Sequence, residues 1–188
     1  MQRNKIHLIL VSTFLLSLLV LASCAVAPAP SAQLSPAQPA PAVTFSVTPA
    51  TGSYTVGDTF TTDLVLTAGT EKVYAIDVVL TYDPTLLEVV DADETTTGVQ
   101  VHTTAEFESY PLNETTDGTV KLGAGSLASE FTGTGSVATV TFHVLKEGTA
   151  TVSYAFEKGS TVDTDAFGTS SDADLLTAVS GATYTLVR

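Results

Sequence analysis

The fold is decided by one ten-residue stretch, VYAIDVVLTY (residues 73–82), in which the character of the side chains alternates. Successive side chains of a β-strand point to opposite faces. One face of this stretch is therefore made by Tyr74, Ile76, Val78, Leu80 and Tyr82. All of these are apolar or aromatic, and we expect them to lie in a core. The other face carries Val73, Ala75, Asp77, Val79 and Thr81. The stretch thus predicts a strand with one buried side and one side that bears a single carboxylate.

The same alternation recurs further along the chain. One later stretch places inward Val140, Phe142 and Val144, and outward Thr139, Thr141 and His143. Another buries Ala150, Val152, Tyr154 and Phe156, and exposes Thr149, Thr151 and Ser153. Including these, we expect strands at residues 43–48, 53–56, 59–67, 73–82, 86–91, 99–103, 105–110, 119–123, 137–145, 149–156 and 176–187. Many short strands with one-sided burial predict an all-β fold, a two-sheet antiparallel β-sandwich.

The N-terminal part of the chain has the pattern of a targeting segment followed by a linker. Arg3 and Lys5 precede an apolar run (residues 6–22), and Leu21-Ala22-Ser23-Cys24 resembles the lipobox of bacterial lipoproteins. The resemblance implies a signal peptide over residues 1–23 and lipidation of Cys24; an ordinary signal peptide with an incidental cysteine is the alternative. Residues 24–42 then form an Ala- and Pro-rich linker with five of the eight prolines. Residues 43–188 remain as one domain of ordinary size.

Charge and cysteine content exclude several kinds of partner. The chain carries 20 acidic and 7 basic residues, a net charge of −13, and loss of the signal peptide would remove two of the basic residues. Such a surface repels phosphate groups, which argues against nucleic acid and against direct contact with an anionic membrane. Cys24 is the single cysteine, so no disulfide can form within the chain. We expect an extracytoplasmic protein that touches the membrane only through its lipid anchor.

Three segments carry a family resemblance. They are VGDTF (residues 56–60), YDPTLLEVV (residues 82–90) and GTGSVATVTF (residues 133–142). In this order and at this spacing they resemble the cohesin domains of cellulosome scaffoldins and related cell-surface proteins. The resemblance implies a nine-stranded jelly-roll sandwich that binds dockerin modules through one sheet face. It also implies that the chain needs no cofactor of its own, since the calcium of such a complex belongs to the dockerin.

The outward face of the strand at residues 73–82 is the candidate partner-binding site. One carboxylate among small apolar residues is typical of a protein interface; a covered strand, or an exposed strand without a partner, is the alternative. The resemblance implies that Asp77 accepts a dockerin hydroxyl and that Tyr110, beside Pro111, is an interface aromatic. Together the predicted partner-binding residues are Ala75, Asp77, Val79, Thr81 and Tyr110. Two positions depart from the family pattern: Ala75 replaces a frequent asparagine, and Gly133 lies near a place where some cohesins carry an acidic contact.

A calcium loop is a further candidate that the sequence does not favour. The segment from Asp163 through Asp165 to Gly168, followed by Asp172 and Asp174, is superficially like one. Calcium loops need oxygen ligands on alternate residues, and here Phe167 occupies a ligand position. We therefore expect a plain acidic turn and no metal.

The sequence offers no catalytic constellation. His143 is expected among outward threonines, and the chain has no G-x-S-x-G motif. Glu106 and Glu108 could share a strand face, as glycosidase carboxylates flank a sugar, but such pairs are usually solvated edges. We predict a monomeric, non-catalytic cell-surface module that captures a dockerin-like module. The alternatives are a carbohydrate-binding module for polysaccharide and a structural envelope domain; the absence of Trp counts against a sugar binder.

Overall fold

The computed structural model describes residues 42–169 and 171–188, and these residues form strands and their connections. The predicted signal peptide, Cys24 and the linker up to residue 41 lie outside the described residues. The strands are β1 (Val43–Thr48), β2 (Thr51–Thr55), β3 (Thr59–Thr81), β4 (Leu87–Val89), β5 (His102–Thr103), β6 (Ser109–Thr116), β7 (Thr119–Gly125), β8 (Phe131–Val144), β9 (Gly148–Tyr154), β10 (Asp165–Gly168), β11 (Ser171–Asp174), β12 (Leu176–Ser180) and β13 (Ala182–Val187). Within these ranges no helix is long and apolar enough to span a membrane.

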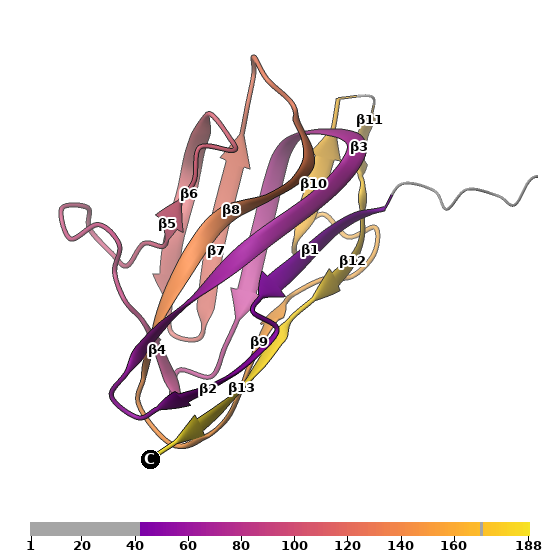
Figure 1. Cartoon of the computed structure of the whole chain (residues 1–188). Coiled ribbons are helices and arrows are strands. Elements are labelled where there is room, and N and C mark those ends of the chain that lie inside the picture. The colour runs from indigo at the N-terminus through magenta and orange to yellow at the C-terminus, as the bar shows by residue number, and fades with distance from the viewer. Residues whose placement is uncertain (1–41, 170) are drawn as a thin grey trace, which may run out of the picture. The chain divides into compact units, whose positions relative to one another are not determined.

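Strand β3 runs through both layers of a sandwich, which confirms the expected two-layer all-β fold. Its first half, up to Thr67, pairs with β1 and β8, whereas its second half, from Val73, pairs with β7 and β10. In Figure 1 the first half of β3 crosses in front of β7 together with β8, and β1 lies beside it. The strand bends where its pairing with β8 shifts register around Gly69, whose φ of 60° suits a glycine.

The remaining strands extend the two layers sideways. In the first layer β12 lies beside β1, and β4 and β5 lie beside β8. In the second layer β6 pairs with β7, and β11 with β10. Strand β9 pairs with the end of β3, and β13 joins β9 to β2. Two pairs, β1 with β12 and β2 with β13, are parallel, which differs from the purely antiparallel expectation. Parallel neighbours need a long connection, and most of the domain separates each of these pairs.

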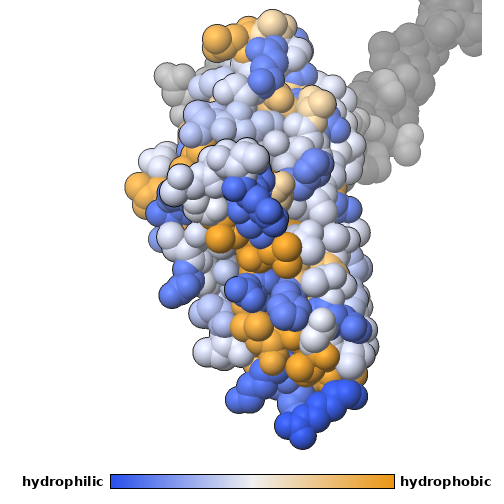
Figure 2. Space-filling model, turned by 90° about the vertical axis from the view of Figure 1, so that its left-hand side faces the viewer, coloured by the Kyte–Doolittle hydropathy of each residue, from blue (hydrophilic) through white to orange (hydrophobic). Residues whose placement is uncertain are grey.

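The core lies between the layers and follows the predicted alternation. Ile76, Val78 and Leu80 are buried. The inward residues of β8 and β9 are buried as predicted: Val140, Phe142, Val144, Ala150, Val152 and Tyr154. Val73 was expected outward but is fully buried, because the register shift next to it breaks the alternation. On the side of β5 and β6, Figure 2 shows apolar patches separated by hydrophilic side chains.

Two local predictions were wrong, and the strands are divided differently from the expectation. Residues 105–108, expected in a strand, are irregular, and β6 instead runs from Ser109 to Thr116. Asp165–Gly168, expected in a turn, is strand β10, because the open edge of β3 supplies hydrogen-bonding partners that outweigh the low strand propensity of Asp and Gly. The described residues contain thirteen strands rather than nine, since several strands are interrupted while β3 is continuous.

Aromatic side chains close the end of the sandwich near β2 and β13. The ring of Tyr54 stacks on Phe60 at 3.8 Å, and Tyr184 packs edge-on to Phe60 at 4.9 Å. The hydroxyl of Tyr184 is 2.8 Å from the carbonyl oxygen of Pro49, to which it donates, and 3.0 Å from Thr62 Oγ1. This contact ties the last strand to the segment between β1 and β2.

Candidate functional site

The candidate site is the outer face of the second layer, formed by β10, the second half of β3, β7 and β6; we call it the binding face. Strand β3 lies in the middle of this face, and its inward residues anchor it in the core. Of its outward residues, Asp77 and Thr81 are exposed, while Ala75 and Val79 are half-buried. The structure therefore brings together four of the five predicted partner-binding residues on one strand.

Asp77 has a glycine on one side and an aspartate on the other. Its cross-strand partners are Gly123 on β7 and Asp165 on β10. A Cβ at Gly123 would lie 3.1 Å from Asp77 Oδ1 and 3.2 Å from Leu112 Cβ. The glycine thus leaves the space that the carboxylate occupies. Burial raises the pKa of Asp77, and within the described ranges no side chain or amide donates a hydrogen bond to it. Asp77 is therefore an acceptor with unused capacity.

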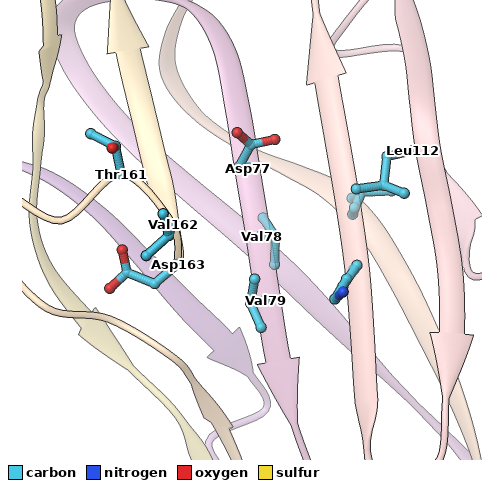
Figure 3. A pocket seen from close by; sticks show the side chains of 9 residues that line it. Asp77, Val78, Val79, Leu112, Thr161, Val162 and Asp163 are labelled. Carbon is cyan, nitrogen blue, oxygen red and sulfur yellow. The ribbon is translucent and has the colours of Figure 1, made fainter.

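A pocket of about 260 Å³ opens beside Asp77; we call it the Asp77 pocket. Figure 3 shows Asp77 and Val79 on β3, with Leu112 on one side and the segment from Thr161 to Asp163 on the other. Val162 is 90% exposed and Leu112 is 37% exposed. The pocket lining therefore combines apolar side chains with three charged groups, Asp77, Lys121 and Asp163.

Leu112, not Tyr110, completes this part of the face. The Tyr110 hydroxyl donates to the carbonyl oxygen of Val137 at 3.1 Å, and its ring packs edge-on against Phe107. Burial raises the pKa of Tyr110. The pairing of β6 with β7 shifts register between Ser109 and Leu112, so the side chain of Tyr110 turns toward β8. The structure does not bring Tyr110 to the Asp77 pocket, and simple alternation along the sequence could not reveal the shift.

A group of buried carboxylates adjoins Asp77. Asp165 is only 1% exposed, and neither of its carboxylate oxygens has a hydrogen-bond partner. One oxygen each of Asp163 and Asp174 is also buried without a partner. Burial, followed by repulsion from Asp174, Asp163 and Asp77, raises the pKa of Asp165 to about 6. The carboxylates on and beneath the binding face therefore give its centre an excess of negative charge, although Lys121 on β7 also lines the Asp77 pocket.

These carboxylates do not form an evident metal site. Asp174 Oδ1 accepts hydrogen bonds from the backbone amides of Ala166 and Leu176, and Asp163 accepts one from Glu157. In the part of the chain that the structure describes, no group of three His, Cys, Asp or Glu residues is arranged to hold a metal ion. Asp163 and Asp165, the calcium-loop candidate that the sequence did not favour, lie in the loop before strand β10 and at the start of that strand.

Three other residues named in the sequence analysis, Gly133, His143 and Glu108, lie away from the Asp77 pocket. Gly133 pairs with Gly69 at the bend of β3, with open space where a Cβ would be. His143 lies 3.7 Å from Glu88 on the first layer. The carboxylate of Glu108 accepts hydrogen bonds from the backbone amides of residues 127–129, which lower its pKa. Glu108 thus fixes a loop and is not one of two carboxylates flanking a sugar.

The fold is a β-sandwich with one open sheet face that carries a pocket and a group of carboxylates. The family model of the Cohesin domain matches residues 43–181, and the chain belongs to this family. Cohesin domains are non-catalytic protein–protein interaction modules. Among curated proteins, no sequence matches the chain.

Solved structures show the same fold. CaCohA2 from Clostridium acetobutylicum is 17% identical, with 78% of this chain and 91% of that chain covered and a TM-score of 0.58. A non-cellulosomal cohesin from the archaeon Archaeoglobus fulgidus is 16% identical, with 78% and 92% covered and a TM-score of 0.56. A type I cohesin–dockerin complex from Clostridium thermocellum contains a chain that is 12% identical, with 78% and 95% covered and a TM-score of 0.55. At these identities the likeness extends to the fold alone.

Proposed function

We propose that this cohesin domain captures a dockerin-like module of another secreted protein through the binding face. The observation that carries the proposal is Asp77, an exposed carboxylate with unused hydrogen-bonding capacity in a pocket that also presents Val79, Leu112 and Val162. A hydroxyl or a basic group of the partner would donate to it, and Val79, Thr81 and Leu112 would supply contact area. The negative centre around Asp165 favours a partner with a basic patch.

The test is capture by the immobilised full chain from the secreted proteins of its source, with elution by a calcium chelator. Dockerin modules depend on calcium, so a dockerin-type partner is released by chelation and carries paired calcium-binding loops of the D-x-D-x-D-G kind. The partner is then produced and titrated by calorimetry. We expect Asp77→Ala to weaken binding by roughly 2 kcal/mol, about thirtyfold in Kd.

The matched control is Asp58→Ala, which removes an exposed aspartate from the turn between β2 and β3. It should leave the affinity within about twofold, because it removes the same charge away from the binding face. Equal affinities of the native chain and Asp77→Ala would refute the role of Asp77. Retention of the chain on polysaccharide, without a protein partner, would support a carbohydrate-binding module instead. An empty result in both assays would favour a structural envelope domain.

We also propose that the domain is held at a cell surface by lipid on Cys24. The support is the lipobox-like sequence of residues 21–24 and the Pro-rich linker that follows it. Metabolic labelling with an alkyne fatty acid should mark the native chain and not Cys24→Ser. Equal labelling of both chains would contradict the anchor.

A further inference from the structure

A second hollow lies on the binding face beside Ala75, two residues before Asp77 on β3; we call it the Ala75 hollow. Ala75 pairs across the sheet with Gly125 on β7, so neither strand projects a side chain beyond Cβ at this point. The hollow measures about 400 Å³, and its rim includes Tyr74, Pro111 and Leu127. The floor of the hollow is therefore formed by the backbones of β3 and β7 and by the Cβ of Ala75.

Leu127 stands at the rim of this hollow entirely in solvent, with an exposure of 101%. Its backbone is nevertheless fixed, because Glu108 accepts hydrogen bonds from the amides of Leu127, Ala128 and Ser129 at 3.0, 3.1 and 3.1 Å. The amide of Ser126 also donates to the carbonyl oxygen of Tyr74 at 2.8 Å. Because this backbone is already ordered, a partner that covers Leu127 has to restrict only the rotamers of its side chain.

The lining of the hollow suits an apolar occupant. Five of its nine lining residues are alanine, glycine, proline or leucine. Of the polar ones, Ser126 Oγ accepts a hydrogen bond from the amide of Glu108, and the Glu108 carboxylate is engaged by backbone amides. A hydroxyl-bearing group would therefore find few free acceptors there. There is also room above the floor, because a Cβ at Gly125 would meet only Tyr74 O at 3.6 Å and Ala75 Cβ at 3.9 Å.

We propose that the Ala75 hollow binds one large apolar side chain, aromatic or leucine-like, of the protein partner, with Leu127 closing over it. The inference rests on the proposed function and specifies the partner. The partner presents an apolar side chain next to the hydroxyl or basic group that donates to Asp77.

The first test is an NMR titration of the isotope-labelled full chain with N-acetylphenylalaninamide, with N-acetylglutaminamide as the polar control. We expect saturable shifts of the Gly125, Ser126 and Leu127 amides with the aromatic probe and none with the polar probe. The absence of saturable shifts with the aromatic probe, or equal shifts with both probes, would overturn the proposal.

Two variants locate the probe. Gly125→Val fills the hollow without backbone strain, since Gly125 is not among the glycines with positive φ; we expect at least tenfold weaker binding of the probe. Leu127→Gln keeps the floor and removes the apolar rim, and it should weaken binding about fivefold. The control Leu145→Gln makes the same change at a leucine that is 40% exposed after β8, with less than a twofold effect. Equal weakening by Leu127→Gln and Leu145→Gln would refute a specific rim.

Binding of the captured partner to these variants tests the apolar anchor separately from the proposed function. A partner that is lost with Asp77→Ala and weakened tenfold or more by Gly125→Val supports both. A partner that is lost with Asp77→Ala but binds Gly125→Val and Leu127→Gln as well as the native chain refutes the apolar anchor and leaves dockerin capture intact.

Discussion

Replacing Asp165 with asparagine should stabilise the protein at neutral pH. The carboxylate is buried, its two oxygens have no hydrogen-bond partner, and its pKa is raised to about 6 from 3.8. A shift of roughly two pKa units at 1.36 kcal/mol each corresponds to about 3 kcal/mol. The amide of an asparagine would carry no charge and could donate to the unpartnered oxygens of Asp163 or Asp174. We therefore expect Asp165→Asn to gain up to about 3 kcal/mol at pH 7.

The gain in the free energy of unfolding on Asp165→Asn should increase as the pH rises. Between about pH 4 and pH 6 the folded protein holds a proton on Asp165 that the unfolded chain has released, so the free energy of unfolding falls as the pH rises. Below pH 4 both states are protonated, and the native chain and Asp165→Asn should differ little. The difference between their free energies of unfolding should grow between about pH 4 and pH 6 and stay constant above pH 6.

Urea unfolding of the full chain, followed by circular dichroism at pH 4 and at pH 7, measures this difference. The matched control is Asp117→Asn, an exposed aspartate in the Asp-Gly turn between β6 and β7, where asparagine is equally suited. The control should change the free energy of unfolding by less than about 0.5 kcal/mol. A gain for Asp165→Asn that is the same at both pH values, or a loss at pH 7, would refute the burial of an unpartnered charge.

Three other perturbations test the packing and the loop of the binding face. Tyr184→Phe removes the hydroxyl that donates to Pro49 O and should lower the free energy of unfolding by about 1–2 kcal/mol; an unchanged urea midpoint would contradict that contact. Phe142→Ala empties a fully buried position between the layers and should cost about 3–5 kcal/mol, and a thermal midpoint within a few degrees of the native one would argue against this core. Glu108→Ala should speed hydrogen exchange at the amides of residues 127–129, which it otherwise engages; exchange rates equal to those of the native chain would show that Glu108 does not fix this loop.

Part of the site could be predicted because it depends on local alternation. In the stretch VYAIDVVLTY, the apolar residues Ile76, Val78 and Leu80 had to face a core, and this alone placed Asp77 outward. The same argument held for β8 and β9. The family resemblance then supplied the sandwich, and the match to residues 43–181 confirms the family; the binding sheet that the resemblance implies stays a prediction.

The misplaced residues lie where pairing between distant strands changes the register. Val73 is buried because β3 bends at Gly69 on its way from one layer to the other. Tyr110 turns toward β8, and Leu112 takes the place near Asp77, because β6 shifts against β7. A shift of one residue moves a side chain to the opposite face, and no local pattern reports such a shift.

The sequence by itself determined the strands whose apolar residues alternate, the acidic character of the chain and the exposure of Asp77. Only the tertiary structure decided which groups surround that aspartate. Asp165 follows Asp77 by 88 positions in the sequence and lies beside it because β10 pairs with the open edge of β3. Ala75 and Gly125 likewise form a hollow only because β7 pairs with β3 in this register. Hydrogen bonding between strands depends on partners far apart in the chain, so the local periodicity of one strand fixes its faces but not its neighbours.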